Sequence, residues 1–129
     1  MSTHHELGKL GETIATDYLM QKGFQILEKN WRSGRAEIDI ITLFKNMIVF
    51  VEVKTRSYTQ FGFPEQSVNS SKQKLMVKAA GDYLYQKNID LELRFDILSL
   101  IKNADNTFEI THFEDAFFPN PADDINSYD

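Results

Sequence analysis

Acidic residues interrupt two apolar segments of the chain, and their types and spacing are suited to chemistry. Asp39 lies within the segment Glu37–Ile41, and Glu52 precedes Lys54 by two residues within the segment Phe50–Lys54. Both segments are rich in β-branched residues, which is typical of strands. Because strand side chains alternate between two faces, Glu52 and Lys54 share a face, and Asp39 can lie across from Glu52 if the strands pair.

Two converging carboxylates beside an ammonium group indicate a site for a hard divalent cation. Like charges raise each other's pKa, and Mg²⁺ or Mn²⁺ removes the conflict by binding carboxylate oxygens while keeping several waters. Such a cation polarises a phosphoryl oxygen and supplies a bound hydroxide, and Lys54 would stabilise the charge developing on the phosphate. The alternative is an ordinary solvated Glu-x-Lys pair on a strand surface, and the spacing by itself leaves both interpretations open.

The elements that would position these residues begin with a helix. Thr3 and Glu6 form a capping-box pattern, and Gly23 ends the run. The helical spacing predicts a buried stripe, and small residues beside it would permit close approach to another element. The stripe comprises Leu7, Leu10, Ile14 and Tyr18, and the small residues are Gly8, Gly11 and Ala15. Glu12 lies beside this stripe, where its side chain could emerge at a groove.

The rest of the chain alternates between strand and helix patterns. Strands are predicted over Phe24–Trp31, Ala36–Leu43, Met47–Thr55, Leu91–Ile101 and Thr107–Phe113, and a second helix is predicted over Ser71–Gln86. This order, α-β-β-β-α-β-β, predicts a mixed α/β layer architecture. We expect residues 1–116 to form one domain and residues 117–129 to form an acidic, flexible tail.

Composition narrows the class of protein. The net charge is −5, but five acids and no Lys or Arg follow position 113, which leaves 14 of each sign in the body of this 129-residue chain. A neutral body can still carry a basic face. The absence of cysteine excludes disulfides, thiol catalysis and cysteine-based metal sites. No apolar stretch is long enough for a membrane span or a signal peptide, so we expect a cytoplasmic protein.

Two segments, Gly34–Ile41 and Phe50–Arg56, resemble those of the YraN-type family of small bacterial proteins. That family is similar to the PD-(D/E)xK nuclease superfamily and, within it, to archaeal Holliday-junction resolvases. The likeness covers most of residues 6–113. It includes Gly8-x-x-Gly11-Glu12-x-x-Ala15, Asn30-Trp31-Arg32, Phe61-Gly62, Ala79-Ala80 and Arg94-Phe95-Asp96. The chain departs from the superfamily motif at Ile38, which stands where a proline would precede Asp39.

The resemblance implies a fold, a site and a substrate. The fold would be a restriction-endonuclease-like αβββαβ core, a mixed sheet flanked by helices. Asp39 and Glu52 would bind Mg²⁺ or Mn²⁺ together with the carbonyl of Val53, Glu12 would reach the metal or one of its waters, and Lys54 would be the catalytic lysine. The activity would be endonucleolytic hydrolysis of DNA, including branched or junction DNA, and the resolvase relatives suggest a homodimer.

Clustered cations could contact nucleic acid phosphates. We assign this role to Arg32, Arg35, Arg56, Lys72 and Lys74, although the helix lysines could equally form a solubilising face. Glu37 could support the metal ligands or pair with Arg35 or Arg94. We expect a structural salt bridge between Arg94 and Asp96 and a place in the core for Trp31. The alternative to an enzyme is a non-catalytic nucleic-acid-binding or adaptor module on the same fold.

Overall fold

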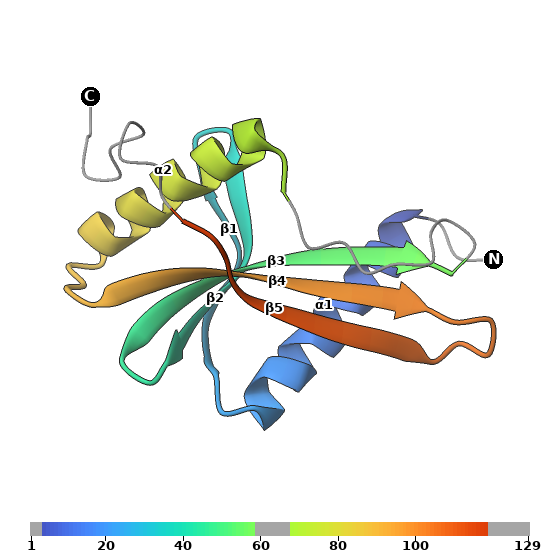
Figure 1. Ribbon diagram of the computed structural model, residues 1–129. Coiled ribbons are helices and arrows are strands. Elements are labelled where there is room, and N and C mark those ends of the chain that lie inside the picture. Colours follow the sequence, from blue (N-terminus) through green and yellow to red (C-terminus); the bar gives the residue numbers. More distant parts are fainter. Residues whose placement is uncertain (1–3, 59–67, 119–129) are drawn as a thin grey trace.

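A five-stranded sheet with one helix on each face forms the protein in the computed structural model, which describes residues 4–58 and 68–118 (Figure 1). The elements are α1 (His4–Gln21), β1 (Gln25–Ser33), β2 (Ala36–Phe44), β3 (Met47–Ser57), α2 (Ser70–Gln86), β4 (Glu92–Lys102) and β5 (Phe108–Phe117). The α/β class and the mixed, helix-flanked sheet predicted from the sequence are confirmed, and the arrangement is consistent with a restriction-endonuclease-like fold.

The strands lie in the order β1-β2-β3-β4-β5, and β3 and β4 form the one parallel pair within this sheet. A parallel pair needs a crossover connection, which α2 provides. The other pairs are antiparallel and follow from short turns. Gly34, at φ 59, and Asn46, at φ 63, adopt the left-handed conformation that such turns require.

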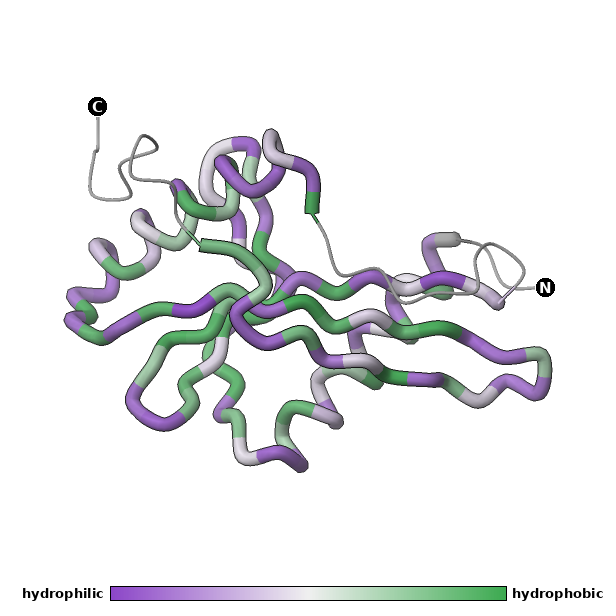
Figure 2. The backbone as a smooth tube through the Cα atoms, in the orientation of Figure 1, coloured by the Kyte–Doolittle hydropathy of each residue, from purple (hydrophilic) through white to green (hydrophobic). Residues whose placement is uncertain are grey.

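Two apolar clusters fill the two sides of the sheet. Phe50 and Phe95 pack with α2 on one side, whereas Val49 and Val51 pack with α1 on the other. Figure 2 shows the apolar residues concentrated along the central strands. The alternation of faces breaks in β2, because Ile38 and Ile41 both face the α2 side. Asp39 lies at this break.

The buried side of α1 differs from the predicted stripe. Leu10 is 46% exposed, and the buried line consists of Gly11, Ala15 and Leu19. A Cβ at Gly11 would lie 2.0 Å from Oγ1 of Thr55, so the absence of a side chain lets α1 approach β3 closely. Two small residues of the helix, Gly11 and Ala15, therefore face the sheet, and Leu10 points outward. The predicted cap residue Thr3 lies outside the described residues.

The second helix has the ends that its sequence favours. The Asn69 side chain caps it by accepting a 2.9 Å hydrogen bond from the main-chain N–H of Lys72. Asn88, at φ 55, lies just beyond the cap residue Lys87. None of the helices in the described ranges is long and apolar enough to cross a membrane.

The last strand is longer than predicted. β5 continues four residues beyond Phe113. Its pairing with β4 is irregular near Asp115, whose φ is 54, and this irregularity accommodates the polar residues there without ending the strand. Phe117, assigned to the tail from the sequence, is the buried end of this strand and stacks on Phe95 with ring centroids 4.8 Å apart. Residues 119–129 lie outside the described ranges.

Candidate active site

The acids Asp39 and Glu52 face each other where β2 and β3 separate. The ladder between these strands ends at the pair Ile40 and Val51, and the next position of the antiparallel register is Asp39 opposite Glu52. Beyond it, the tip of the β1–β2 hairpin turns toward the N-terminal end of α2, whereas β3 continues beside β4 (Figure 1). The two acids thus lie at the base of a fork between the strands, as their spacing predicted.

The side chain of Asp39 is held in place by Val53, the residue that follows Glu52. The main-chain N–H of Val53 donates a 2.8 Å hydrogen bond to Oδ2 of Asp39, which replaces a ladder bond lost at the fork. Burial, followed by the charge and the side-chain hydrogen bond of Glu52, raises the pKa of Asp39 to about 8, although the Val53 bond opposes this shift. The Asp39 carboxyl is therefore mainly protonated at neutral pH when no metal ion is bound.

Glu52 is buried, with 2% of its surface exposed, and its two oxygens differ. Oε2 contacts the ammonium group of Lys72, which extends from the first turn of α2. Oε1 is a buried oxygen that accepts no hydrogen bond from any N–H or hydroxyl donor in the described ranges. The adjacent Asp39 carboxyl can donate to Glu52 only while it holds a proton.

Lys72 is the residue of the candidate site whose contact with Glu52 sequence reasoning missed. We expected a phosphate contact, and the structure instead places its ammonium group on Glu52. Burial lowers the pKa of Lys72, but the hydrogen bond and charge of Glu52 outweigh burial and leave its pKa raised, so the side chain stays charged. No local pattern could reveal this contact, because 20 residues separate the partners.

Glu12 and Lys54 complete the predicted catalytic set. Lys54 is half-buried on β3, two residues beyond Glu52. Glu12 is held beside the fork by the close approach of Gly11 to Thr55, and its negative charge contributes to the raised pKa of Asp39. Glu12 is not grouped tightly with both acids, because the described ranges contain no set of three His, Asp or Glu side chains arranged to hold a metal.

The fork opens into cavities on both sides. A cavity of about 490 Å³ on the α2 side is lined by Arg35, Asp39 and Lys72, among others. A second cavity of about 500 Å³ on the α1 side is lined by Glu12, Arg32 and neighbours. Glu37 lines both. The cavity on the α2 side therefore reaches Asp39, whereas the cavity on the α1 side reaches Glu12 but neither acid of the pair.

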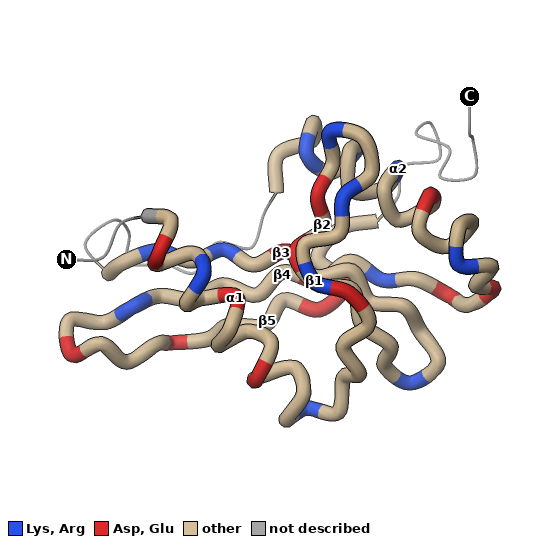
Figure 3. Tube along the Cα trace, turned by 180° about the vertical axis from the view of Figure 1, so that it is seen from behind, with Lys and Arg blue, Asp and Glu red and all other residues tan. Residues whose placement is uncertain are grey.

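The predicted phosphate-binding residues are only partly brought together. Lys and Arg positions gather where the tip of the β1–β2 hairpin lies beside the N-terminal end of α2 (Figure 3). Arg35 lies there with Lys72, at the cavity that contains Asp39. Arg32 lines the opposite cavity, whereas Lys74, exposed on α2, and Arg56, half-buried near the end of β3, line neither of the two.

Side-chain contacts in the structure decide three further predictions made from the sequence. Glu37 pairs with Arg32 at 2.6 Å, not with either of the arginines considered from the sequence. The salt bridge between Arg94 and Asp96 is present, with two contacts of 2.8 and 2.7 Å. Trp31 packs edge-on against Tyr83 at a centroid distance of 5.2 Å, which confirms its place in the core.

Comparison with known proteins gives a family. The model of the uncharacterised protein family UPF0102 matches residues 11–100, which include both acids, Glu12 and Lys54. The chain belongs to this family. It is 48% identical over 118 residues to a UPF0102 protein of Flavobacterium psychrophilum, covering 92% of this chain and 98% of that one. A relative from Thermodesulfovibrio yellowstonii is 46% identical over 113 residues, covering 88% and 96%.

The donors at the fork of this UPF0102 protein fit a hard cation. Two carboxylates and the carbonyl of Val53 are oxygen ligands of the kind that Mg²⁺ and Mn²⁺ prefer. Oε1 of Glu52 is the feature that a cation would explain, because this buried oxygen has no N–H or hydroxyl donor in the described ranges and depends on a protonated Asp39. A bound ion would replace the proton that Asp39 holds.

Proposed function

We propose that this UPF0102 protein is a metal-dependent nuclease that hydrolyses phosphodiester bonds in DNA. The observation that carries the proposal is the buried pair Asp39 and Glu52 at the base of an open fork, with an oxygen of Glu52 that has no donor in the described ranges other than a protonated Asp39. A structural ion pair would satisfy both oxygens. An acid pair of which Asp39 lines an open cavity instead suits a cation and a charged substrate.

Each residue has a role in this proposal. Asp39, Glu52 and the Val53 carbonyl would hold Mg²⁺ or Mn²⁺, which when bound supplies a Lewis acid and a water of lowered pKa. Lys54 would place its positive charge beside the scissile phosphate, where negative charge develops. Glu12 would orient a water of the site from the α1 side, and Arg35 would contact a neighbouring phosphate from the hairpin tip.

Lys72 would change partner during binding. Its ammonium group balances Glu52 when no cation is present, and the same group lies at the cavity where the substrate phosphates would enter. Binding of a cation by the acids would release Lys72 toward these phosphates. Lys74 and Arg32 would extend the basic surface on either side, and Arg56 would contribute from β3.

The test is a cleavage assay with Mg²⁺ and with Mn²⁺. Its substrates are single-stranded, duplex, flapped and four-way-junction DNA, together with RNA. Wild type should cut at least one DNA substrate, and Glu52→Gln should not, whereas Glu109→Gln on the exposed part of β5 should cut normally. Binding of DNA without cutting of any substrate would instead identify a non-catalytic binding module.

Cleavage of a branched substrate would also require a particular oligomeric state. Symmetric cuts at a two-fold junction need two sites that face one substrate, so junction cleavage would require a homodimer. Light scattering on the protein with and without junction DNA measures this directly. A monomer that cuts flaps or single strands but not junctions would retain the nuclease and exclude junction resolution.

A further inference from the structure

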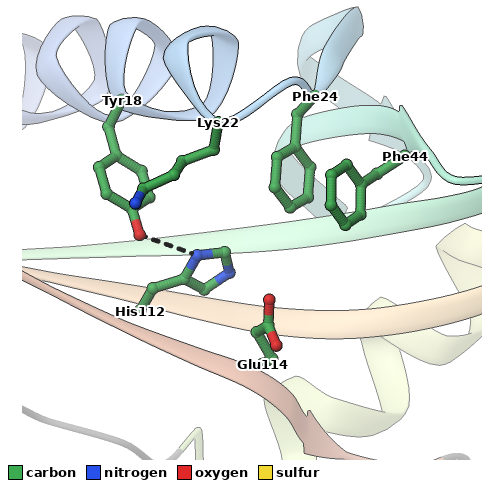
Figure 4. Close-up of a pocket in the computed structure, with 6 residues that line it drawn as sticks. All are labelled: Tyr18, Lys22, Phe24, Phe44, His112 and Glu114. Atoms are coloured by element: carbon green, nitrogen blue, oxygen red, sulfur yellow. Dashed lines mark hydrogen bonds between the residues drawn. The ribbon is translucent and has the colours of Figure 1, made fainter.

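A third cavity lies at the other end of α1 and shares no lining residue with the fork. Its volume is about 370 Å³, and it is lined by Tyr18, Lys22, Phe24, Phe44, His112 and Glu114 (Figure 4). Tyr18 follows Glu12 by six residues, which corresponds to about 9 Å along a helix. The volume lies within the range of small-molecule sites.

A hydrogen-bond relay beneath this cavity fixes its polar groups. Asp96 is fully buried and accepts hydrogen bonds from Arg94 and from the main-chain N–H of Asp115. His112 Nε2 lies 2.8 Å from Oδ2 of Asp96 and, facing an ionised carboxylate, must be the donor. In the neutral imidazole, Nδ1 is then the acceptor for the Tyr18 hydroxyl, 3.2 Å away.

This relay defines what Tyr18 offers to a ligand. With His112 in this form, the Tyr18 hydroxyl donates its proton to Nδ1, so its oxygen presents lone pairs to a ligand and acts as an acceptor. Burial, followed by the charges of Glu114 and Asp96, raises the pKa of Tyr18, so the phenol stays protonated and is not an activated nucleophile. The geometry is therefore suited to recognition.

The rim of the cavity carries one group of each charge. Glu114 extends from β5 toward the space beside Phe44 (Figure 4), and its side chain is 59% exposed, with Oε1 3.7 Å from Arg94. The ammonium group of Lys22 lies 5.7 Å from the centre of the Tyr18 ring. Phe24 and Phe44 stack face to face with ring centroids 3.9 Å apart and form an apolar wall beside these groups.

The ligand that matches this arrangement is planar, carries N–H donors on one edge and has an anionic group. Guanine presents two adjacent N–H donors, which suit the two oxygens of one carboxylate. We propose that the cavity binds a guanine nucleotide, with Glu114 accepting from the base edge, Tyr18 accepting from a further donor, the phenylalanine wall covering the ring and Lys22 contacting a phosphate.

This proposal does not depend on the nuclease activity. The same chemistry is offered by a free nucleotide and by an unpaired guanosine within a strand. The two sources are separated by the experiment, which also includes Asp39→Asn. Because Asp39 does not line this cavity, that variant should bind the nucleotide as wild type does, whatever happens at the fork.

The measurement is a ¹H–¹⁵N NMR titration with GMP, and with AMP, guanosine and inorganic phosphate in parallel. GMP should cause saturable shifts at residues of the cavity, such as Tyr18, His112 and Glu114, and should bind at least tenfold more tightly than AMP or phosphate. Equal binding of AMP and GMP, tightest binding of phosphate alone, or an absence of saturable shifts would overturn the proposal.

Two substitutions assign the contacts. Glu114→Gln should weaken GMP at least tenfold, because a carboxamide places an N–H donor against the guanine donors, whereas Glu109→Gln, outside the cavity on the same strand, should not. Lys22→Gln should reduce GMP binding to that of guanosine. Unchanged GMP binding in Glu114→Gln would overturn the base contact.

A competition experiment shows whether the ligand is a free nucleotide or an unpaired guanosine within a strand. If a short single-stranded oligonucleotide with one guanine displaces GMP, and its adenine counterpart does not, then the site takes an unpaired guanosine of a strand. If neither oligonucleotide displaces bound GMP, then the site takes the free nucleotide. Either result is consistent with guanine recognition at this cavity, because both begin from bound GMP.

Discussion

The main-chain N–H of Val53 donates a 2.8 Å hydrogen bond to Oδ2 of Asp39. Since Val53 directly follows Glu52, one short stretch of β3 both supplies one acid of the site and fixes the other. The position of Asp39 is thus set by the strand that carries its partner. This arrangement keeps the two carboxyl groups together even though β2 leaves β3 at this point.

The acid pair should make thermal stability depend on metal. A cation that binds the folded protein at 100 times its dissociation constant adds about 2.7 kcal/mol. We therefore expect Mn²⁺ to raise the melting temperature of wild type by several degrees. Asp39→Asn keeps an oxygen for the Val53 bond but loses the charge, so its melting temperature should not respond.

Differential scanning calorimetry with EDTA and with Mn²⁺ measures this response. Asp90→Asn, at an exposed loop position, is the matched control and should behave as wild type. An equal response of Asp39→Asn and wild type to Mn²⁺ would show that the ion binds elsewhere.

Lys72 should stabilise the metal-free protein. Removing one partner of a fully buried ion pair costs about 3–5 kcal/mol, but the Lys72 side chain is 42% exposed and solvent screens the pair. We therefore expect Lys72→Met to lose about 1–2 kcal/mol in urea denaturation with EDTA, and to regain most of it with Mn²⁺. Lys74→Met, exposed on the same helix, should change stability by less than about 0.5 kcal/mol. A loss of equal size with and without Mn²⁺ would argue against cation exchange at Glu52.

The two glycines of α1 should respond oppositely to alanine. Gly8 has open space where a Cβ would lie, so Gly8→Ala should stabilise the helix by up to about 1 kcal/mol. Gly11→Ala would place a methyl group against Thr55 and should destabilise the protein by about 1–3 kcal/mol despite the same gain in helix propensity.

Chemical denaturation of both variants measures the contrast. Gly11→Ala should also reduce cleavage, since a shift of α1 moves Glu12 away from the fork. Similar stabilities of the two variants would mean that α1 can move away from β3 at little cost.

Lowering the pH should reduce the stability of the folded protein through protonation of Asp96. Burial raises the pKa of this carboxyl, but hydrogen bonds from His112, Arg94 and the main chain of Asp115 outweigh burial and leave its pKa below the ordinary value. A carboxyl with a lowered folded pKa contributes stability that is complete above the unfolded value of about 3.9 and is lost as the pH falls below it.

Unfolding free energy measured between pH 7 and pH 2 tests this sign. Asp96→Asn should be less stable than wild type at pH 7 by about 3–5 kcal/mol, because the largely buried Arg94 keeps only the more distant and more exposed Glu114 as an acidic partner, and should lose less on acidification. If Asp96→Asn does not fold, His112→Gln removes one of the four hydrogen bonds to Asp96 and should show the same trend at reduced size. Parallel pH profiles for wild type and both variants would exclude this role.

Much of the site could be predicted from the sequence because it depends on local rules. The alternation of strand side chains places Glu52 and Lys54 on one face, and the short turn near Asn46 makes β2 and β3 antiparallel neighbours, which brings Asp39 opposite Glu52. The small residue Gly11 likewise indicated a close approach of α1, and the structure shows what it approaches.

Tertiary structure decided the contacts between residues far apart in the chain. Lys72 reaches Glu52 because α2 crosses over the sheet between the parallel strands β3 and β4. Tyr18 meets His112 because β5 pairs with β4 within the sheet and the His112 side chain faces α1. Periodicity assigns a residue to a face of its own element, but not the element that the face will cover. That choice is made by packing of whole apolar surfaces, which also turned Leu10 to solvent and brought the smaller Gly11 against β3.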